Sequence, residues 1–127
     1  MIEPLKIEPT HKTPRVYFDP SEGAFEISGR SIPEDSVGFY KQILDWIDFY
    51  GSNPEEKTHF KFEFEYFNTS SSKNILEMLK KLEEIFHKGH DIKITWYYDE
   101  DDEDMEETGT DYKALLSVPL ELLMKLH

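Results

Sequence analysis

The amino-acid sequence predicts an α/β fold: a two-layer sandwich in which a mixed β-sheet carries helices mainly on one face. The first observation is alternation, since phenylalanines alternate with Lys61, Glu63 and Glu65 in residues 58–66. A strand buried on both faces would be apolar throughout, so this strand has one wet face. The second observation is that segments of helical periodicity separate the strand-like segments, which favours parallel neighbours beside an N-terminal hairpin.

The N-terminal part of the chain is predicted to form three short strands. Residues 5–7 fit a short edge strand. Residues 15–18 and 24–28 are rich in aromatic and β-branched side chains and flank the turn sequence DPSEG at 19–23. This arrangement predicts an antiparallel hairpin.

The first helix is predicted to begin at Ser31 and to end near Gly51. Ser31 and Glu34 have the spacing of a capping box, and Pro33 suits a first helical turn because that position needs no N–H donor. Gly51 precedes Asn53-Pro54, a typical helix stop. The apolar stripe of this helix is expected to comprise Val37, Tyr40, Ile43, Leu44, Trp46 and Ile47.

The second half of the chain is predicted to alternate between strand and helix. Residues 58–66 and 91–98 fit two strands, and the helix between them ends at Gly89. Because a helix links them, these strands are expected to be parallel neighbours. A third helix is expected over about 102–116, and residues 118–126 fit either a strand or a helix. The apolar face of the middle helix is formed by Ile75, Leu76, Leu79, Leu82 and Phe86.

Composition limits the classes of function. The 127 residues fit one domain spanning 1–127, and the absence of cysteine excludes disulfides, cysteine nucleophiles and cysteine-bound zinc. The first residues lack the basic and apolar regions of a signal peptide, so a cytoplasmic location is expected. A net charge of −13 argues against binding to nucleic acid or to an anionic membrane.

The acidic run 99–107 (DEDDEDMEE) is one candidate site. Its spacing does not fit an EF-hand loop, because the sixth and twelfth positions counted from Asp99 hold Asp104 and Thr110. Carboxylates are also favourable in the first turn of a helix, which gives the run a purely structural explanation. Binding of a divalent metal and docking of a partner protein both stay open as alternatives.

The sequence gives little support for an enzyme. It contains no G-x-S-x-G elbow, no G-x-x-x-x-G-K-[ST] loop and no G-x-G-x-x-G fingerprint. His87 and His90 have a loosely metal-like spacing, but Gly89 lies between them and no third ligand is evident. We therefore expect no catalytic residue, no cofactor and no metal.

The segment FNTSSSK, residues 67–73, is the strongest candidate site. A single residue suffices to cap a helix, yet Asn68, Thr69, Ser70, Ser71 and Ser72 are all cap-forming residues. They follow the carboxyl end of a strand and open a helix, whose N-terminus accommodates phosphate. Lys73 lies one turn further on. These residues favour a regulatory phosphorylation site without distinguishing among the four hydroxyls.

Four segments together resemble the SiaC family of regulatory phosphoproteins, and the resemblance extends over almost the whole chain. The segments are TPRVYFDPSEGAFEISGRSIPED (13–35), FYKQILDWIDFYGSNP (39–54), FEYFNTSSSK (64–73) and WYYDEDDEDMEETGTDY (96–112). The resemblance implies a small α/β domain similar to the anti-anti-sigma (STAS-like) fold.

The resemblance also implies a function in bacterial partner switching. A cognate Ser/Thr protein kinase phosphorylates the threonine of the F-N-T-S-S segment, which is Thr69 here, and a PP2C-like phosphatase removes the phosphate. In one branch of the family the unphosphorylated protein binds and activates a diguanylate cyclase, which raises cyclic-di-GMP. The alternatives are an interaction domain without modification, in which the serines only cap the helix, and a divalent-metal-binding domain that uses residues 99–107.

Overall fold

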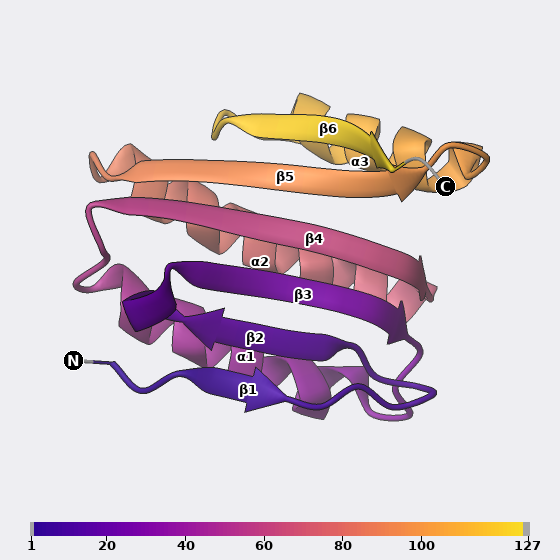
Figure 1. Cartoon of the computed structure of the whole chain (residues 1–127), viewed down its shortest axis with the longest axis horizontal. Coiled ribbons are helices and arrows are strands. Elements are labelled where there is room, and N and C mark those ends of the chain that lie inside the picture. The colour runs from indigo at the N-terminus through magenta and orange to yellow at the C-terminus, as the bar shows by residue number, and fades with distance from the viewer. Residues whose placement is uncertain (1, 126–127) are drawn as a thin grey trace.

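The computed structural model describes residues 2–125 as a six-stranded β-sheet with helices on one side (Figure 1). In space the strands follow their order in the chain, from β1 to β6. β1, β2 and β3 pair antiparallel, whereas β3, β4, β5 and β6 pair parallel, which confirms the predicted mixed sheet. The strands are β1 (Leu5–Ile7), β2 (Arg15–Asp19), β3 (Ala24–Ser31), β4 (Lys57–Phe67), β5 (Asp91–Asp99) and β6 (Leu120–Lys125).

The three α-helices are α1 (Ser36–Gly51), α2 (Thr69–His87) and α3 (Glu103–Leu115). Each helix connects two parallel strands, and Figure 1 shows all three on the same side of the sheet. This confirms the prediction that helices cover one face while the other stays open. As a consequence, the N-termini of the three helices lie at the same end of the sheet, beyond the carboxyl ends of β3, β4 and β5.

The core lies between the sheet and the helices and is rich in aromatic side chains. Phenylalanines of β2, β3 and β4 contact one another and the ring of Tyr50 from α1. Burial of this much aromatic surface is a large part of the stability of such a domain. The fully buried aromatic residues are Phe18, Phe25, Tyr40, Tyr50, Phe60, Phe62 and Trp96.

The predicted capping box at Ser31 is wrong. Ser31 is the last residue of β3 and is fully buried, because the parallel pairing of β3 with β4 continues to Ser31 opposite Phe67. Helix α1 begins instead at Ser36, where the carboxylate of Asp35 accepts a hydrogen bond from the backbone N–H of Gly38. Val37 therefore lies in the first turn and is 75% exposed, outside the apolar stripe.

The alternation in residues 58–66 places Tyr66 on the same face as Phe60, Phe62 and Phe64 and so predicts that it points inward, which is also wrong. The register between β3 and β4 shifts by one residue, so that Gly29 lies opposite Phe64 and Arg30 opposite Tyr66. The extra residue, Glu65, reverses the alternation beyond it. Tyr66 is 50% exposed as a result, and Phe67 turns inward, where its ring contacts Phe64 and Trp96.

The C-terminal segment that the sequence left open is a strand. β6 pairs parallel with β5, and the side chain of Leu120 is buried against the core. Residue 126 lies outside the described part of the chain. The third helix follows its predicted range closely, with Asp102 as its N-cap.

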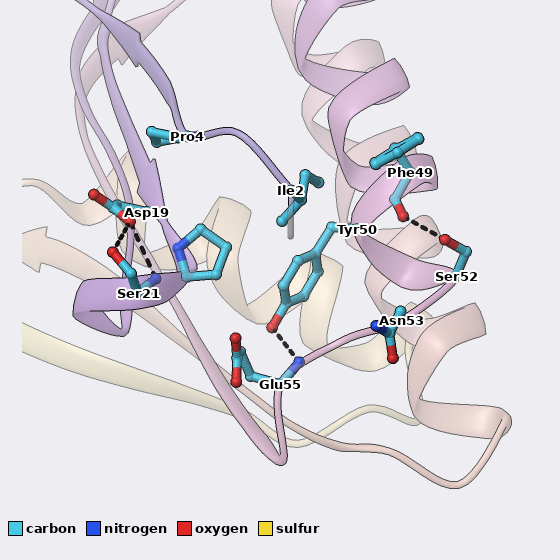
Figure 2. Close-up of a pocket in the computed structure, with 10 residues that line it drawn as sticks. Ile2, Pro4, Asp19, Ser21, Phe49, Tyr50, Ser52, Asn53 and Glu55 are labelled. Carbon is cyan, nitrogen blue, oxygen red and sulfur yellow. Dashed lines mark hydrogen bonds between the residues drawn. The ribbon is translucent and has the colours of Figure 1, made fainter.

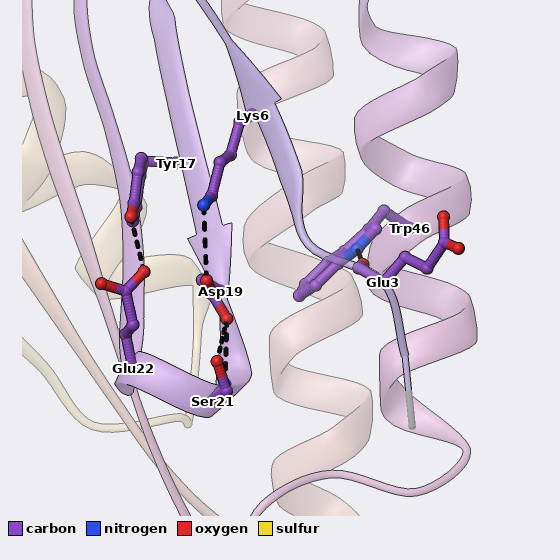
Figure 3. Close-up of polar contacts among 7 residues, drawn as sticks. All are labelled: Glu3, Lys6, Tyr17, Asp19, Ser21, Glu22 and Trp46. Atoms are coloured by element: carbon purple, nitrogen blue, oxygen red, sulfur yellow. Dashed lines mark hydrogen bonds and ion pairs between the residues drawn. The ribbon is translucent and has the colours of Figure 1, made fainter.

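The N-terminal edge strand is fastened on two sides (Figure 3). The indole N–H of Trp46 on α1 donates to the carbonyl of Glu3 at 2.8 Å. Lys6 forms an ion pair with Asp19 at 3.5 Å, and Asp19 also accepts hydrogen bonds from Ser21 in the short 3₁₀ helix η1 (Pro20–Glu22). These contacts attach β1 to both a helix and the hairpin, although β1 contributes only three residues to the sheet.

None of the helices between residues 2 and 125 has both the length and the apolar composition needed to cross a lipid bilayer.

Candidate functional site

The segment 67–73 forms a sharp turn from β4 into α2, at the end of the sheet where the N-termini of the three helices lie. Phe67 is the last residue of β4, Asn68 is the N-cap, and Thr69 is the first residue of α2. The side-chain carbonyl of Asn68 accepts a hydrogen bond from the N–H of Ser71 at 2.9 Å. Asn68 thus provides the cap by itself, and the hydroxyl residues that follow it are not needed for this role.

Ser71 is buried in a chain of hydrogen bonds that joins α2 to β3 and α1. Its hydroxyl donates to the carbonyl of Ser31 at 3.0 Å and accepts from the hydroxyl of Ser31 at 2.9 Å. The Ser31 proton is therefore engaged, so the hydroxyl of Tyr40, at 2.6 Å, donates to Ser31. The Ser71 hydroxyl is inaccessible from solvent and holds the start of α2 against the end of β3.

The two tyrosines of this region keep their protons over a wide pH range. Burial raises the pKa of Tyr40 to about 12, although hydrogen bonds with Ser31 and Ser71 act in the opposite direction. Burial also raises the pKa of Tyr112 on α3 to about 12, and its hydroxyl donates to the carbonyl of Ser72 at 3.0 Å. Both hydroxyls are therefore donors at neutral pH: that of Tyr112 connects α3 to the start of α2, and that of Tyr40 connects α1 to Ser31, which in turn bonds to Ser71.

We expect the free energy of unfolding to fall as pH rises from 10 to 12. The unfolded tyrosines release their protons near pH 10, whereas Tyr40 and Tyr112 in the folded protein keep theirs until about pH 12. In this window the folded state binds more protons, so stability decreases with rising pH. Urea unfolding at pH about 8, 10 and 11 measures the slope. The Tyr40→Phe/Tyr112→Phe double variant should have a smaller slope; an equal slope would contradict the assignment.

The hydroxyls of Ser70 and Ser72 are also engaged. Ser70 forms a 2.6 Å hydrogen bond with the hydroxyl of Ser36 in the first turn of α1, and it donates to Asn68 at 3.2 Å. Ser72 is half-buried, and its hydroxyl donates to the carbonyl of Thr69 at 2.7 Å. Neither side chain is available without breaking a contact with the surrounding structure.

Thr69 differs from the three serines. Its side chain is exposed, and its hydroxyl has no hydrogen-bond partner within residues 2–125. Lys73, one turn further along α2, is exposed as well, and its ammonium group forms no ion pair with any residue in the described range. Among the described residues, the segment therefore presents the Thr69 hydroxyl without a partner at the positive end of a 19-residue helix, and the unpaired ammonium group of Lys73 lies nearby.

The side of the site that faces α3 is acidic. A hollow of about 160 Å³ separates the end of β4 from the start of α3. Asp102 and Asp104 line it on one side, and Glu65 lines it on the other. Negative charge added at the start of α2 would thus lie near a surface that already carries the carboxylates of Glu65, Asp102 and Asp104. Aside from these carboxylates, the hollow is lined by Tyr66, Phe67, Met105 and Thr108.

The acidic run 99–107 opens α3. Asp102 caps the helix by accepting from the N–H of Met105 at 3.0 Å, while Glu103, Asp104 and Glu106 lie in the first turn. Such positions suit carboxylates because the helix dipole is positive there. Residues 2–125 contain no group of three or more histidine or carboxylate side chains placed to hold a metal ion.

His87 and His90 are not brought together as a site. His87 lies in the last turn of α2, where its ring forms a 2.6 Å hydrogen bond with the hydroxyl of Ser117. The turn that follows the helix contains Gly89 with a φ of 99°, a conformation that favours glycine. The hydrogen bond between His87 and Ser117 connects the end of α2 to the segment before β6, which gives His87 a structural role.

A larger hollow of about 420 Å³ lies at the opposite end of the sheet (Figures 1 and 2). Ile2, Phe49 and Tyr50 provide much of its apolar wall. The Tyr50 hydroxyl accepts from the N–H of Glu55 at 3.0 Å, and Asp19 is bound to Ser21. These hydrogen bonds stabilise the turn that follows α1 and the start of η1.

Sequence reasoning missed the residues that surround the segment 67–73 from other elements. Ser31, Ser36 and Tyr112 form hydrogen bonds with it, yet they lie 34 or 40 positions away along the chain, and Tyr40 in turn bonds to Ser31. One signal was available: parallel pairing of the hairpin strand with β4 would place their carboxyl ends side by side. Parallel pairing of β3 with β4 brings Ser31, at the end of β3, close to Ser70 and Ser71, which follow the end of β4.

Comparison with known proteins gives a consistent result. A family model described as "SiaC family regulatory phosphoprotein" matches residues 7–125. An uncharacterised protein of Pseudomonas aeruginosa strain UCBPP-PA14 is 29% identical over 115 residues, which is 91% of each chain.

Solved structures of SiaC from Pseudomonas aeruginosa have the same fold. One of them has a TM-score of 0.88 at 26% sequence identity and covers 98% of this chain and 100% of its own. In another, SiaC is in complex with the diguanylate cyclase SiaD, which it activates; it has a TM-score of 0.89 at 27% identity and covers 95% of this chain and 99% of its own. These matches confirm the predicted fold class, while the likeness to the anti-anti-sigma fold stays a prediction.

Proposed function

Because this chain belongs to the SiaC family of regulatory phosphoproteins, we propose that it is a non-enzymatic switch in which phosphorylation of Thr69 controls binding to an effector protein. The observation that carries this proposal is the state of the Thr69 hydroxyl, which is exposed and has no hydrogen-bond partner within residues 2–125. Family membership supports the regulatory role, and the geometry supports the choice of residue.

A kinase must bring the acceptor hydroxyl into its own active site, so access decides among the four candidates. Ser71 is excluded by burial, and phosphorylation of Ser70 would break its contact with Ser36. Ser72 is half-buried and bound to a backbone carbonyl. Modification of Thr69 breaks no hydrogen bond in the described structure, which makes Thr69 the most favourable acceptor.

Phosphate on Thr69 would change the charge of the site without requiring a new fold. It adds about −1.5 to −2 charges and strong acceptor oxygens. The positive end of α2 and the ammonium group of Lys73 would stabilise the phosphate. Together with Asp102 and Asp104 across the hollow, the phosphate would make this surface more negative and repel acidic groups of a partner. The state without phosphate is the one expected to bind.

We propose a diguanylate cyclase as the effector and a cognate Ser/Thr protein kinase and a PP2C-like phosphatase as the modifying enzymes. Support for the effector comes from the SiaC structure in complex with the cyclase SiaD. Support for the two enzymes comes from the resemblance of FNTSSSK to the family's phosphorylated segment. A circuit of this kind operates in the cytoplasm and sets the level of cyclic-di-GMP.

Phosphorylation with the cognate kinase and ATP, followed by mass spectrometry, tests the site. We expect one phosphate on the wild type, located at Thr69, and none on Thr69→Ala. Ser70→Ala is the matched control, because it changes the neighbouring exposed hydroxyl and should still be phosphorylated at Thr69. Phosphate on another residue would overturn the choice of Thr69. Its absence from the wild type would favour the alternative, an unmodified interaction domain.

A further inference from the structure

The strand β6 forms one edge of the sheet, and its outer side carries no partner strand within residues 2–125 (Figure 1). Its sequence is LELLMK, with Leu123 42% exposed and Met124 45% exposed. Free strand edges normally contain prolines or inward-pointing charges that prevent pairing with another chain. β6 contains no proline, and its two charged residues, Glu121 and Lys125, lie on either side of the apolar residues Leu122, Leu123 and Met124, so its edge is suited to pairing.

The opposite edge is different. β1 has only three residues, carries Lys6 at its centre and is flanked by Pro4 and Pro9. Short length, a lysine and neighbouring prolines are the features that keep an edge strand from pairing. β6 also follows a proline, Pro119, and ends in Lys125, so the two edges differ in length and in the exposed apolar residues Leu123 and Met124 that only β6 carries.

The hydrogen bonds to β5 establish which backbone groups of β6 point outward. The N–H of Ile94 donates to the carbonyl of Pro119 at 2.9 Å, and Ile94 is opposite Leu120 in the register. In a parallel pair, the groups that face the neighbour belong to alternate residues, so those of 119, 121, 123 and 125 face β5. The N–H and C=O groups of Leu120, Leu122 and Met124 point away from the sheet.

One register for pairing of β6 with a second copy of itself brings opposite charges together, whereas the register centred on Leu122 pairs no charged residues with each other. In an antiparallel pair centred on Leu123, Glu121 of each copy lies opposite Lys125 of the other, and Leu122 lies opposite Met124. Centring on Glu121 or on Lys125 would place like charges opposite each other, which is unfavourable. In the Leu123 register the outward backbone groups of Leu122 and Met124 form the hydrogen-bonded pair.

We propose that the chain forms a two-fold symmetric dimer by antiparallel pairing of β6 with β6 of a second copy. The dimer buries Leu123 against Leu123 on the open face and Leu122 against Met124 on the helix face. The charged side chains already near the strand are weakly held: Lys93 is 3.5 Å from Glu121, and Lys125 is 3.5 Å from Asp99 and 3.8 Å from Glu63. They are free to adjust across the interface.

The dimer is expected to be weak and reversible. Pairing along one six-residue strand buries less than the roughly 1,000 Å² of a stable interface. The net charge of −13 on each copy also opposes association, although salt at about 0.15 M limits this repulsion to distances under about 8 Å. The equilibrium should therefore depend on protein concentration in the micromolar to millimolar range.

Sedimentation equilibrium of the whole chain over a concentration series tests the proposal. We expect the wild type to dimerise and Lys125→Glu to raise the dimer dissociation constant by about tenfold or more, because two repulsive pairs with Glu121 replace two attractive ones. The double variant Glu121→Lys/Lys125→Glu should dimerise more strongly than Lys125→Glu, although Lys93, Asp99 and Glu63 repel the exchanged charges within each copy. A wild type that stays monomeric into the millimolar range, or a Lys125→Glu variant that dimerises like the wild type, would overturn the proposal.

Two further variants separate this pairing from effects of net charge or folding. Lys80→Glu makes the same charge change on an exposed position of α2 and should leave the dissociation constant unchanged. Leu123→Lys lowers the net negative charge, yet it should weaken the dimer because Leu123 faces its own copy at the two-fold axis. Dimerisation unaffected by Leu123→Lys, in a variant with a native circular dichroism spectrum, would exclude this register.

Discussion

Phosphorylation of Thr69 is expected to weaken binding to the effector by about 100-fold or more, equivalent to about 2.7 kcal/mol. Thr69 is exposed at the start of α2, so the phosphate would lie at the surface of the proposed docking site. A partner surface suited to a neutral hydroxyl would have to desolvate a dianion there, and like-charge contacts at an interface cost several kcal/mol. Asp102 and Asp104 already make this edge negative.

Isothermal titration calorimetry with the effector measures this loss for the phosphorylated protein and for Thr69→Glu. Thr69→Val, which removes the hydroxyl without adding charge, should bind like the wild type. Lys80→Glu adds a similar negative charge away from the site and should also bind normally. Equal affinities for the phosphorylated and unphosphorylated proteins would refute the switch, whereas a loss of affinity in Thr69→Val would show that the hydroxyl itself is recognised.

The fold of Thr69→Glu should stay intact. Because no hydrogen bond of the described structure depends on the Thr69 hydroxyl, and because a carboxylate in the first turn of a helix is favourable, we expect the thermal midpoint to change little. This separates a change in docking from local unfolding as the cause of weaker binding. A large drop in the midpoint would point to unfolding of the start of α2 instead.

The largest expected effect on stability comes from Trp96→Ala, which should lower the free energy of unfolding by about 3–5 kcal/mol. The Trp96 side chain is fully buried on β5 and contacts the rings of Phe62, Phe67 and Tyr112. Its indole N–H donates to the carbonyl of Met105 on α3 at 3.1 Å. Removal of the ring leaves a cavity between the sheet and α3 and also removes this hydrogen bond. Domains of this size are stable by only about 5–15 kcal/mol.

Urea unfolding followed by circular dichroism measures this change. Trp96→Phe retains part of the ring volume but loses the hydrogen bond, so it should cost clearly less than Trp96→Ala. Tyr97→Ala is the positional control, since Tyr97 is the next residue on β5 but lies on the open face, half-buried. A loss in Trp96→Ala no larger than in Tyr97→Ala would contradict the role assigned to Trp96 in the core.

Local patterns were sufficient to predict much of the fold. Alternation in residues 58–66 predicted β4 and its wet face, and the apolar periodicity of residues 75–86 predicted α2. Both signals are strong because the segments are long and their periods of 2 and 3.6 residues differ clearly. The open face of the sheet followed from the same alternation.

The failures occurred where contacts between distant segments override local preference. Ser31 has the spacing of a cap, but pairing with Phe67 on β4 keeps it in β3. Tyr66 continues the alternation of β4 in the sequence, but the register shift beside Arg30 turns it outward. Neither effect is visible in a short window of sequence, because each depends on a residue more than 30 positions away.

The candidate site shows the same division. By itself the sequence determined that a strand passes into a helix at residues 67–73, and that this helix start offers hydroxyls and a positive dipole end suited to phosphate. It did not determine which hydroxyl is free. Tertiary structure decided that, because Ser31, Ser36 and Tyr40, brought close by the parallel pairing of β3 with β4 and the packing of α1, occupy the hydroxyls of Ser70 and Ser71. None of these partners bonds to Thr69, so its hydroxyl stays exposed and unbound within the described chain.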